Sequence, residues 1–160
     1  MNPKPRIGLM VVVGVLAATS WTVAQSKDPF VGSWTLNVAK SKYNPGPAPK
    51  SQTSTYEAAG KGYKISVRST PATGAAQEWS YATNLDGKPA PIIGINPNAD
   101  MVTTKRVDAL TLEVVYMKNG KETTRQRNVV AADGKTRTVT TTGVDVTGQK
   151  VNNVAVYEKK

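Results

Sequence analysis

Residues 110–142 read LTLEVVYMKNGKETTRQRNVVAADGKTRTVTTT, and this stretch decides the fold class. It contains three runs rich in Val, Thr and Tyr, separated by Asn119-Gly120 and Asp133-Gly134. Asx-Gly pairs adopt the positive φ angles of tight hairpin turns at little steric cost. The stretch therefore predicts three antiparallel strands joined by two hairpin turns.

The same pattern continues on both sides of this stretch. Gly60-Lys61-Gly62, residues 71–74, Asp86-Gly87 and Thr147-Gly148 separate further β-rich runs. The intervals are too short for crossover helices, and no stretch after Lys27 has helical periodicity, so neighbouring strands should be antiparallel. The predicted strands are residues 30–42, 51–59, 63–69, 76–84, 89–94, 101–107, 110–117, 122–130, 135–142 and 150–158.

The predicted fold class is all-β, an antiparallel up-and-down meander of about ten strands. Closure of such a meander into a barrel removes its free edges and leaves room for a small ligand. A two-sheet sandwich is the alternative, but sandwiches usually need long Greek-key connections. The chain has one long irregular segment, residues 43–50, and one shorter loop, residues 95–100. A barrel is therefore the preferred prediction.

Strand alternation predicts which side chains point inward. In the first strand these are Phe30, Trp34, Leu36 and Val38. Later inward faces mix polar and apolar side chains, namely Gln77, Trp79, Tyr81 and Thr83, then Leu110, Leu112, Val114 and Tyr116. A dry core would leave such polar groups unpaired at a cost of a few kcal/mol each. This composition favours a barrel interior that holds water or a ligand.

Residues 1–24 are predicted to be a signal peptide. Lys4 and Arg6 precede an apolar run over residues 7–18, and Thr22-Val23-Ala24 supplies the small residues of a cleavage site. We expect the cut after Ala24, with a cut after Ser26 as second choice. The apolar run is shorter than the roughly 20 residues of a membrane span. Residues 25–160 should thus form one domain, periplasmic or secreted and not integral to a membrane.

The composition excludes several kinds of chemistry. The chain has no Cys and no His, so it lacks a thiol for lipid attachment or catalysis and an imidazole base or ligand. Calcium-loop spacing and a Gly-x-Ser-x-Gly elbow are also missing. We therefore expect no enzyme activity, no metal and no cofactor.

The net charge of +10, which would be about +8 without the leader, is spread along the chain. This predicts a soluble surface, with a weak contact to anionic envelope surfaces as the alternative. Nucleic acid is not an expected partner, because no basic run is interleaved with aromatic residues.

Both chain ends carry a family resemblance. Residues 30–36, Phe-Val-Gly-Ser-Trp-Thr-Leu, resemble the first strand of lipocalins and intracellular fatty-acid-binding proteins, in which Gly-x-Trp closes the barrel floor. Residues 156–159 resemble the last strand of the fatty-acid-binding proteins. Residues 28–34, 36–37, 40–42 and 44–47 resemble a family of uncharacterised exported bacterial proteins. This resemblance extends over the chain after the leader, through residues 151–154, and brings no known activity. It implies a lipocalin-like (calycin-type) barrel with Trp34 in its floor.

The chain also departs from the fatty-acid-binding proteins. They hold a carboxylate with an Arg two residues before the last-strand Tyr; that position is Ala155 here, whereas Tyr157 is kept. Their two-helix lid is replaced by the Pro-rich residues 43–50. Fatty-acid binding is therefore not carried over. Arg125 or Arg127 can supply an inward guanidinium instead, unless both point to solvent.

The leading functional hypothesis is non-covalent binding of a small, largely apolar molecule inside the barrel. Trp79, Tyr81, Tyr116 and Tyr157 would form its wall, although each can equally be core packing. Arg125 or Arg127 would anchor an anionic group. The alternative is an envelope interaction protein with a filled core, whose basic surface and loops bind a protein partner or an anionic surface, possibly as an inhibitor.

Overall fold

The structure is a computed structural model that describes residues 28–160. The predicted signal peptide and its cleavage site lie outside the described residues. The described residues form eleven strands, which are β1 (Gly32–Lys42), β2 (Ser51–Ala59), β3 (Gly62–Thr70), β4 (Gln77–Thr83), β5 (Asp86–Pro91), β6 (Ile93–Gly94), β7 (Met101–Asp108), β8 (Thr111–Lys118), β9 (Lys121–Val130), β10 (Thr136–Val144) and β11 (Lys150–Lys159). Within these residues no helix is long and apolar enough to span a membrane.

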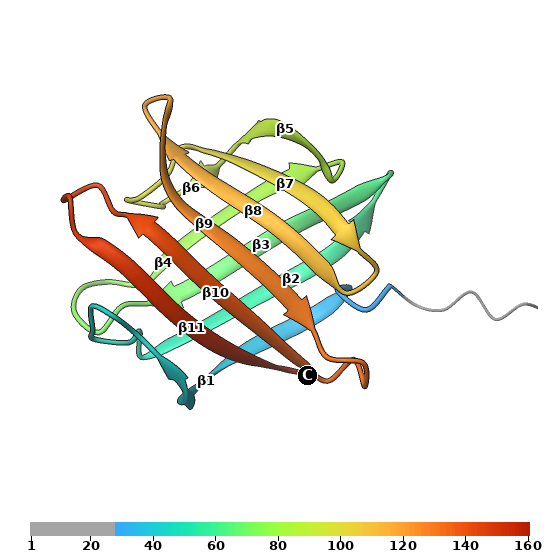
Figure 1. Cartoon of the computed structure of the whole chain (residues 1–160), viewed down its shortest axis with the longest axis horizontal. Helices are drawn as coiled ribbons and strands as arrows, with labels where there is room; N and C mark the ends of the chain where they lie inside the picture. Colours follow the sequence, from blue (N-terminus) through green and yellow to red (C-terminus); the bar gives the residue numbers. More distant parts are fainter. Residues whose placement is uncertain (1–27) are drawn as a thin grey trace, which may run out of the picture.

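All pairings are antiparallel, and they arrange the strands in a nearly closed barrel (Figure 1). The order around the sheet is β5-β7-β8-β9-β10-β11-β1-β2-β3-β4-β6. The first and last strands are paired, with Leu36 opposite Tyr157. The predicted all-β antiparallel meander is therefore confirmed, and its closure joins the two ends of the described chain.

The barrel has one seam, where the predicted strand over residues 89–94 is divided in two. β5 pairs with β7, whereas β6 pairs with β4 on the opposite side of the seam, and only Ile92 separates β5 from β6. Gly94 makes the β6 pairing possible. It has a φ of +106°, and a Cβ there would lie 2.4 Å from the carbonyl oxygen of Glu78. This division explains why there are eleven strands rather than about ten.

The inward residues follow the predicted alternation over most strands. Phe30, Trp34 and Leu36 are buried, as are Leu112 and Val114 of β8. The prediction for Val38 is wrong, because its side chain is 40% exposed. The β1–β11 register shifts between Asn37 and Lys42, and this irregularity ends the alternation before Val38.

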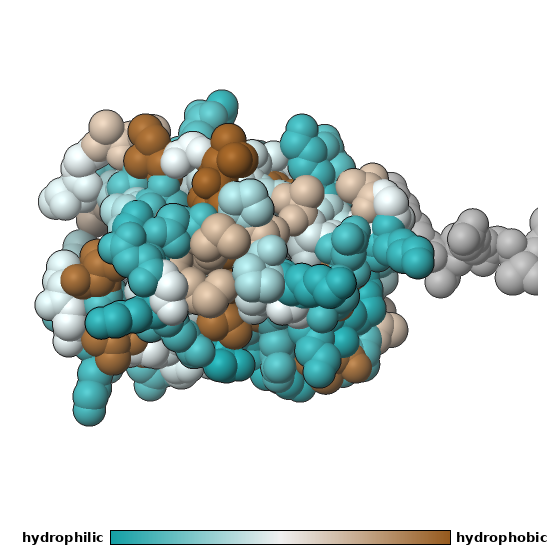
Figure 2. Space-filling view, turned by 90° about the horizontal axis from the view of Figure 1, so that it is seen from above, coloured by the Kyte–Doolittle hydropathy of each residue, from teal (hydrophilic) through white to brown (hydrophobic). Residues whose placement is uncertain are grey.

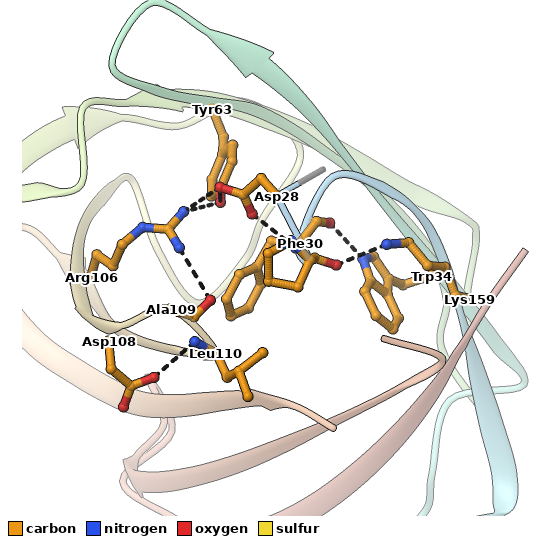
Figure 3. A network of polar contacts seen from close by, with 10 residues as sticks. Asp28, Phe30, Trp34, Tyr63, Arg106, Asp108, Ala109, Leu110 and Lys159 are labelled. Carbon is orange, nitrogen blue, oxygen red and sulfur yellow. Dashed lines mark hydrogen bonds and ion pairs between the residues drawn. The ribbon is translucent and has the colours of Figure 1, made fainter. Parts of the chain in front are cut away.

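One end of the barrel is closed by the residues that precede β1. Trp34 lies fully buried there, and its Nε1 donates a hydrogen bond to the carbonyl oxygen of Phe30 over 2.8 Å. Lys159 Nζ donates to the carbonyl oxygen of Pro29 over 2.8 Å. The prediction that Trp34 lies in the barrel floor is confirmed (Figure 3).

A polar cluster holds the start of the described chain against this floor. Asp28 Oδ2 accepts hydrogen bonds from Tyr63 Oη over 2.6 Å and from Arg106 Nη2 over 2.7 Å, and Arg106 also contacts Tyr63 Oη (Figure 3). The Arg106 guanidinium lies 5.6 Å from the centroid of the Phe30 ring. These contacts of Asp28 hold residues 28–31 across the closed end of the barrel.

Candidate functional site in the barrel interior

A cavity of about 430 Å³ occupies the barrel interior above the floor. Its rim is built by three segments from the opposite end of the barrel, namely the β1–β2 connector with Tyr43 and Pro45, residues 96–99 before β7, and the β10–β11 turn with Asp145. The meander places them together, because alternate connections of an up-and-down barrel lie at the same end. The cavity is therefore closed below and open above.

The four predicted aromatic residues come together in the wall of this cavity. Trp79 and Tyr81 come from β4, Tyr116 from β8 and Tyr157 from β11. Burial raises the pKa of Tyr81, Tyr116 and Tyr157 well above the usual value for a phenol. These hydroxyls are therefore neutral at physiological pH, and they act as hydrogen-bonding groups rather than as charges.

The expectation of an inward Arg125 or Arg127 is wrong. Each side chain is 52% exposed; Arg125 pairs with Glu122 and Arg127 pairs with Glu113 on the outer surface. Their neighbours on β9, Thr124 and Gln126, line the cavity instead. Because side chains of a strand alternate between its two faces, Arg125 and Arg127 must point outward.

The inward arginine is Arg137 on β10, which is 3% exposed and lines the cavity. Its Nη1 donates to Tyr56 Oη over 2.5 Å and to Asn128 Oδ1 over 3.1 Å. Its Nη2 donates to Ser54 Oγ over 2.5 Å. The sequence carries a signal for this residue, because Arg137 and apolar Val139 fall on the same face of an alternating strand.

Three aromatic rings surround the Arg137 guanidinium. Its Cζ lies 4.5 Å from the ring centroid of Tyr157, 4.9 Å from that of Tyr56 and 5.4 Å from that of Trp34. Such contacts stabilise a cation partly withdrawn from water. Arg137 therefore lies where the floor meets the cavity, in contact with both.

A second hollow, of about 610 Å³, lies on the outer side of β2, β3 and β4. Its lining mixes small hydroxyl side chains, apolar side chains and the exposed ion pair of Arg68 and Glu78; the first are Thr53, Thr55, Ser66 and Ser80, and the second are Val67, Trp79 and Ile93. Figure 2 shows hydrophobic residues scattered among hydrophilic ones on the face that it presents. The interior cavity is the stronger candidate, because it combines buried aromatic rings with a buried charge.

Comparison with known proteins finds no matching family model, no matching curated protein and no matching solved structure. Within residues 28–160, no three acidic side chains lie together in a way that suits a metal ion. The chemistry of the interior cavity is thus the basis for a functional assignment.

Proposed function

We propose that this protein binds a small, largely apolar molecule non-covalently inside its barrel. The observation that carries the proposal is the interior itself, which is open over about 430 Å³ instead of being filled by side chains. This volume lies within the range of about 300–1,000 Å³ typical of small-molecule sites. The alternative function with a filled core is not supported by such an interior.

The wall mixes polar side chains, among them Gln52, Gln126 and Asn153, with apolar ones, so it can provide both kinds of contact that binding needs. Ile65, Val67, Val139 and the aromatic rings would remove apolar ligand surface from water, which contributes about 25 cal/mol per Å². The neutral tyrosine hydroxyls and Arg137 would orient the ligand by hydrogen bonds. If the predicted signal peptide directs export, the protein would carry or sequester its ligand outside the cytoplasm.

Titration with N-phenyl-1-naphthylamine, a neutral dye whose emission rises in apolar surroundings, tests this proposal. We expect saturable binding of one dye per chain. Ala155→Phe places a ring in the cavity, because Ala155 is buried in its wall, and should abolish binding. Val154→Phe is the matched control, since Val154 is the exposed neighbour on the outer face of β11.

Native mass spectrometry of protein purified without detergent provides a second measurement. A discrete added mass that Ala155→Phe removes and Val154→Phe retains would support a ligand in the barrel. Dye binding that is equal in both variants would place the dye on the surface and contradict the proposal. So would the absence of both dye uptake and added mass in the unchanged protein.

A further inference from the structure

Arg137 is a buried cation without an anionic partner. It makes no ion pair within residues 28–160, and its hydrogen-bond partners, Ser54, Tyr56 and Asn128, are all uncharged side chains. A charge removed from water is costly unless a counter-charge and hydrogen bonds compensate for it. The three surrounding rings offset only part of this cost, so the site is electrostatically incomplete.

The groups around Arg137 leave hydrogen-bond donors unpaired. Arg137 Nε and the Asn128 amide nitrogen beside it are buried without a partner. The Ser54 and Tyr56 hydroxyls already accept from Arg137, so their own protons remain available for donation. A ligand group that pairs with these donors would be rich in hydrogen-bond acceptors.

The Asn128 orientation strengthens this conclusion. Its Oδ1 faces Arg137 Nη1 over 3.1 Å, and an exchange of its amide oxygen and nitrogen would put two donors against each other. The unpaired Asn128 nitrogen is therefore a consequence of Arg137. A buried amide donor without a partner is costly in a protein interior.

From this cluster we infer that the ligand of the proposed cavity is a monoanion, with a carboxylate or sulfonate group at Arg137. The inference rests on the proposed function. Among the described residues that line the cavity, the charged ones are Arg137 at the base and Asp145 at the rim. One buried positive charge matches one negative charge, and Asp145 disfavours a second anionic group near the mouth.

A pair of dyes with the same aromatic frame tests the charge preference. N-Phenyl-1-naphthylamine is neutral, and 8-anilinonaphthalene-1-sulfonate adds one sulfonate to that frame. We expect the unchanged protein to bind the sulfonate at least about tenfold more tightly. Arg137→Gln should remove this preference, so that the sulfonate and the neutral dye bind with affinities within about twofold of each other.

Arg125→Gln is the matched control. It removes the same charge from the outer surface, where Arg125 is half exposed, and should change neither affinity by more than about twofold. Circular dichroism should give the same β spectrum for all three proteins. If Arg137→Gln does not fold, competition of 2-naphthoate against uncharged 2-naphthamide on the unchanged protein tests the same point.

The outcomes separate the two proposals. Binding of the neutral dye without any preference for the sulfonate or the naphthoate overturns the anionic ligand and leaves the proposed function standing. If Arg125→Gln abolishes the preference for the sulfonate as fully as Arg137→Gln does, the anionic ligand at Arg137 is also overturned. The preference would then come from the net charge of the protein. Failure of both dyes to enter the cavity overturns the proposed function itself.

Discussion

Arg137 and Tyr157 are direct partners across the β10–β11 ladder, and the guanidinium of the first lies 4.5 Å from the ring centroid of the second. Adjacent strands of a sheet place cross-strand partners side by side, so the guanidinium reaches this ring from a residue that is distant in sequence.

Stability should fall at alkaline pH because of the buried tyrosines. Burial raises the pKa of Tyr157, Tyr81 and Tyr116, whereas in the unfolded chain these phenols ionise near pH 10. Above that pH the unfolded state binds fewer protons than the folded state, so the free energy of unfolding decreases as the pH rises. The decrease is up to about 1.4 kcal/mol per pH unit for each tyrosine.

Urea unfolding between pH 8 and pH 11 measures this effect. Tyr157→Phe should reduce the slope of the free energy of unfolding against pH, because it removes one of the titrating groups. The comparison with the unchanged protein cancels the contribution of the lysines. An identical alkaline slope in both proteins would mean that Tyr157 titrates alike when folded and unfolded.

Truncation of the floor should be strongly destabilising. Phe30 is fully buried, with its ring centroid 6.1 Å from that of Tyr56 and 6.3 Å from that of Tyr63. Phe30→Ala should lower the free energy of unfolding by about 3–5 kcal/mol, through lost burial and the resulting void. Val38→Ala, at an exposed site in β1, should cost less than about 0.5 kcal/mol. Urea denaturation of both variants measures the difference, and a Phe30→Ala cost below about 1 kcal/mol contradicts the floor role.

The Asp28 cluster should contribute more to the free energy of unfolding than an ion pair on the outer surface does. Asp28→Asn removes the carboxylate that Tyr63 and Arg106 share and leaves Arg106 without its ion pair, so we expect a loss of about 1–2 kcal/mol. Glu78→Gln breaks the more exposed pair with Arg68 and should cost less than about 0.5 kcal/mol. Thermal unfolding of the two variants checks the order, and equal costs would show that the cluster adds nothing beyond a surface pair.

The seam depends on the absence of a side chain at Gly94. Gly94→Ala meets both a positive φ and a Cβ position 2.4 Å from the Glu78 carbonyl oxygen, so the β4–β6 pairing must shift. Gly74→Ala is the matched control, because Gly74 also has a positive φ, of +96°, but its Cβ would meet no atom within 4 Å. Strain at such a φ costs about 1–3 kcal/mol.

We expect Gly94→Ala to cost clearly more than Gly74→Ala in thermal unfolding. Hydrogen exchange should also be faster at the amide of Ile95, which donates to the Glu78 carbonyl oxygen over 2.7 Å, in Gly94→Ala alone. Similar melting temperatures and similar exchange in the two variants would contradict the close approach at the seam.

Local sequence signals were sufficient for most of the fold. The Asx-Gly turns and β-rich runs gave the antiparallel meander, and the alternation gave the inward Trp79, Tyr81 and Tyr116. What they missed depended on pairing between strands. The two roles of residues 89–94 follow from the separate partners of β5 and β6, which no local pattern encodes. The prediction for Val38 is wrong because the pairing of β1 with β11 shifts register between Asn37 and Lys42. The sequence of β1 alone does not reveal this shift.

The central polar residue of the site was harder to predict for a different reason. Arg125 and Arg127 carry the same charge as Arg137, and a side-chain type does not tell which face of a strand it occupies. Only the phase of the alternation separates them, since Arg137 shares its parity with buried Val139 and the other two share theirs with exposed Val129. The contacts to Ser54 and Tyr56 come from β2, on the far side of the closure between β1 and β11.

The seam between β5 and β6 has a consequence for how copies of this protein meet. A free strand edge usually offers its amides and carbonyls to a strand of another molecule. Here the two edge strands are consecutive in the chain and are separated by Ile92 alone, so an incoming strand would have to fit between segments one residue apart. Pro89 and Pro91 also lack the amide hydrogens that such a strand would need. The open seam between β5 and β6 is thus a poor site for pairing with a strand of another copy.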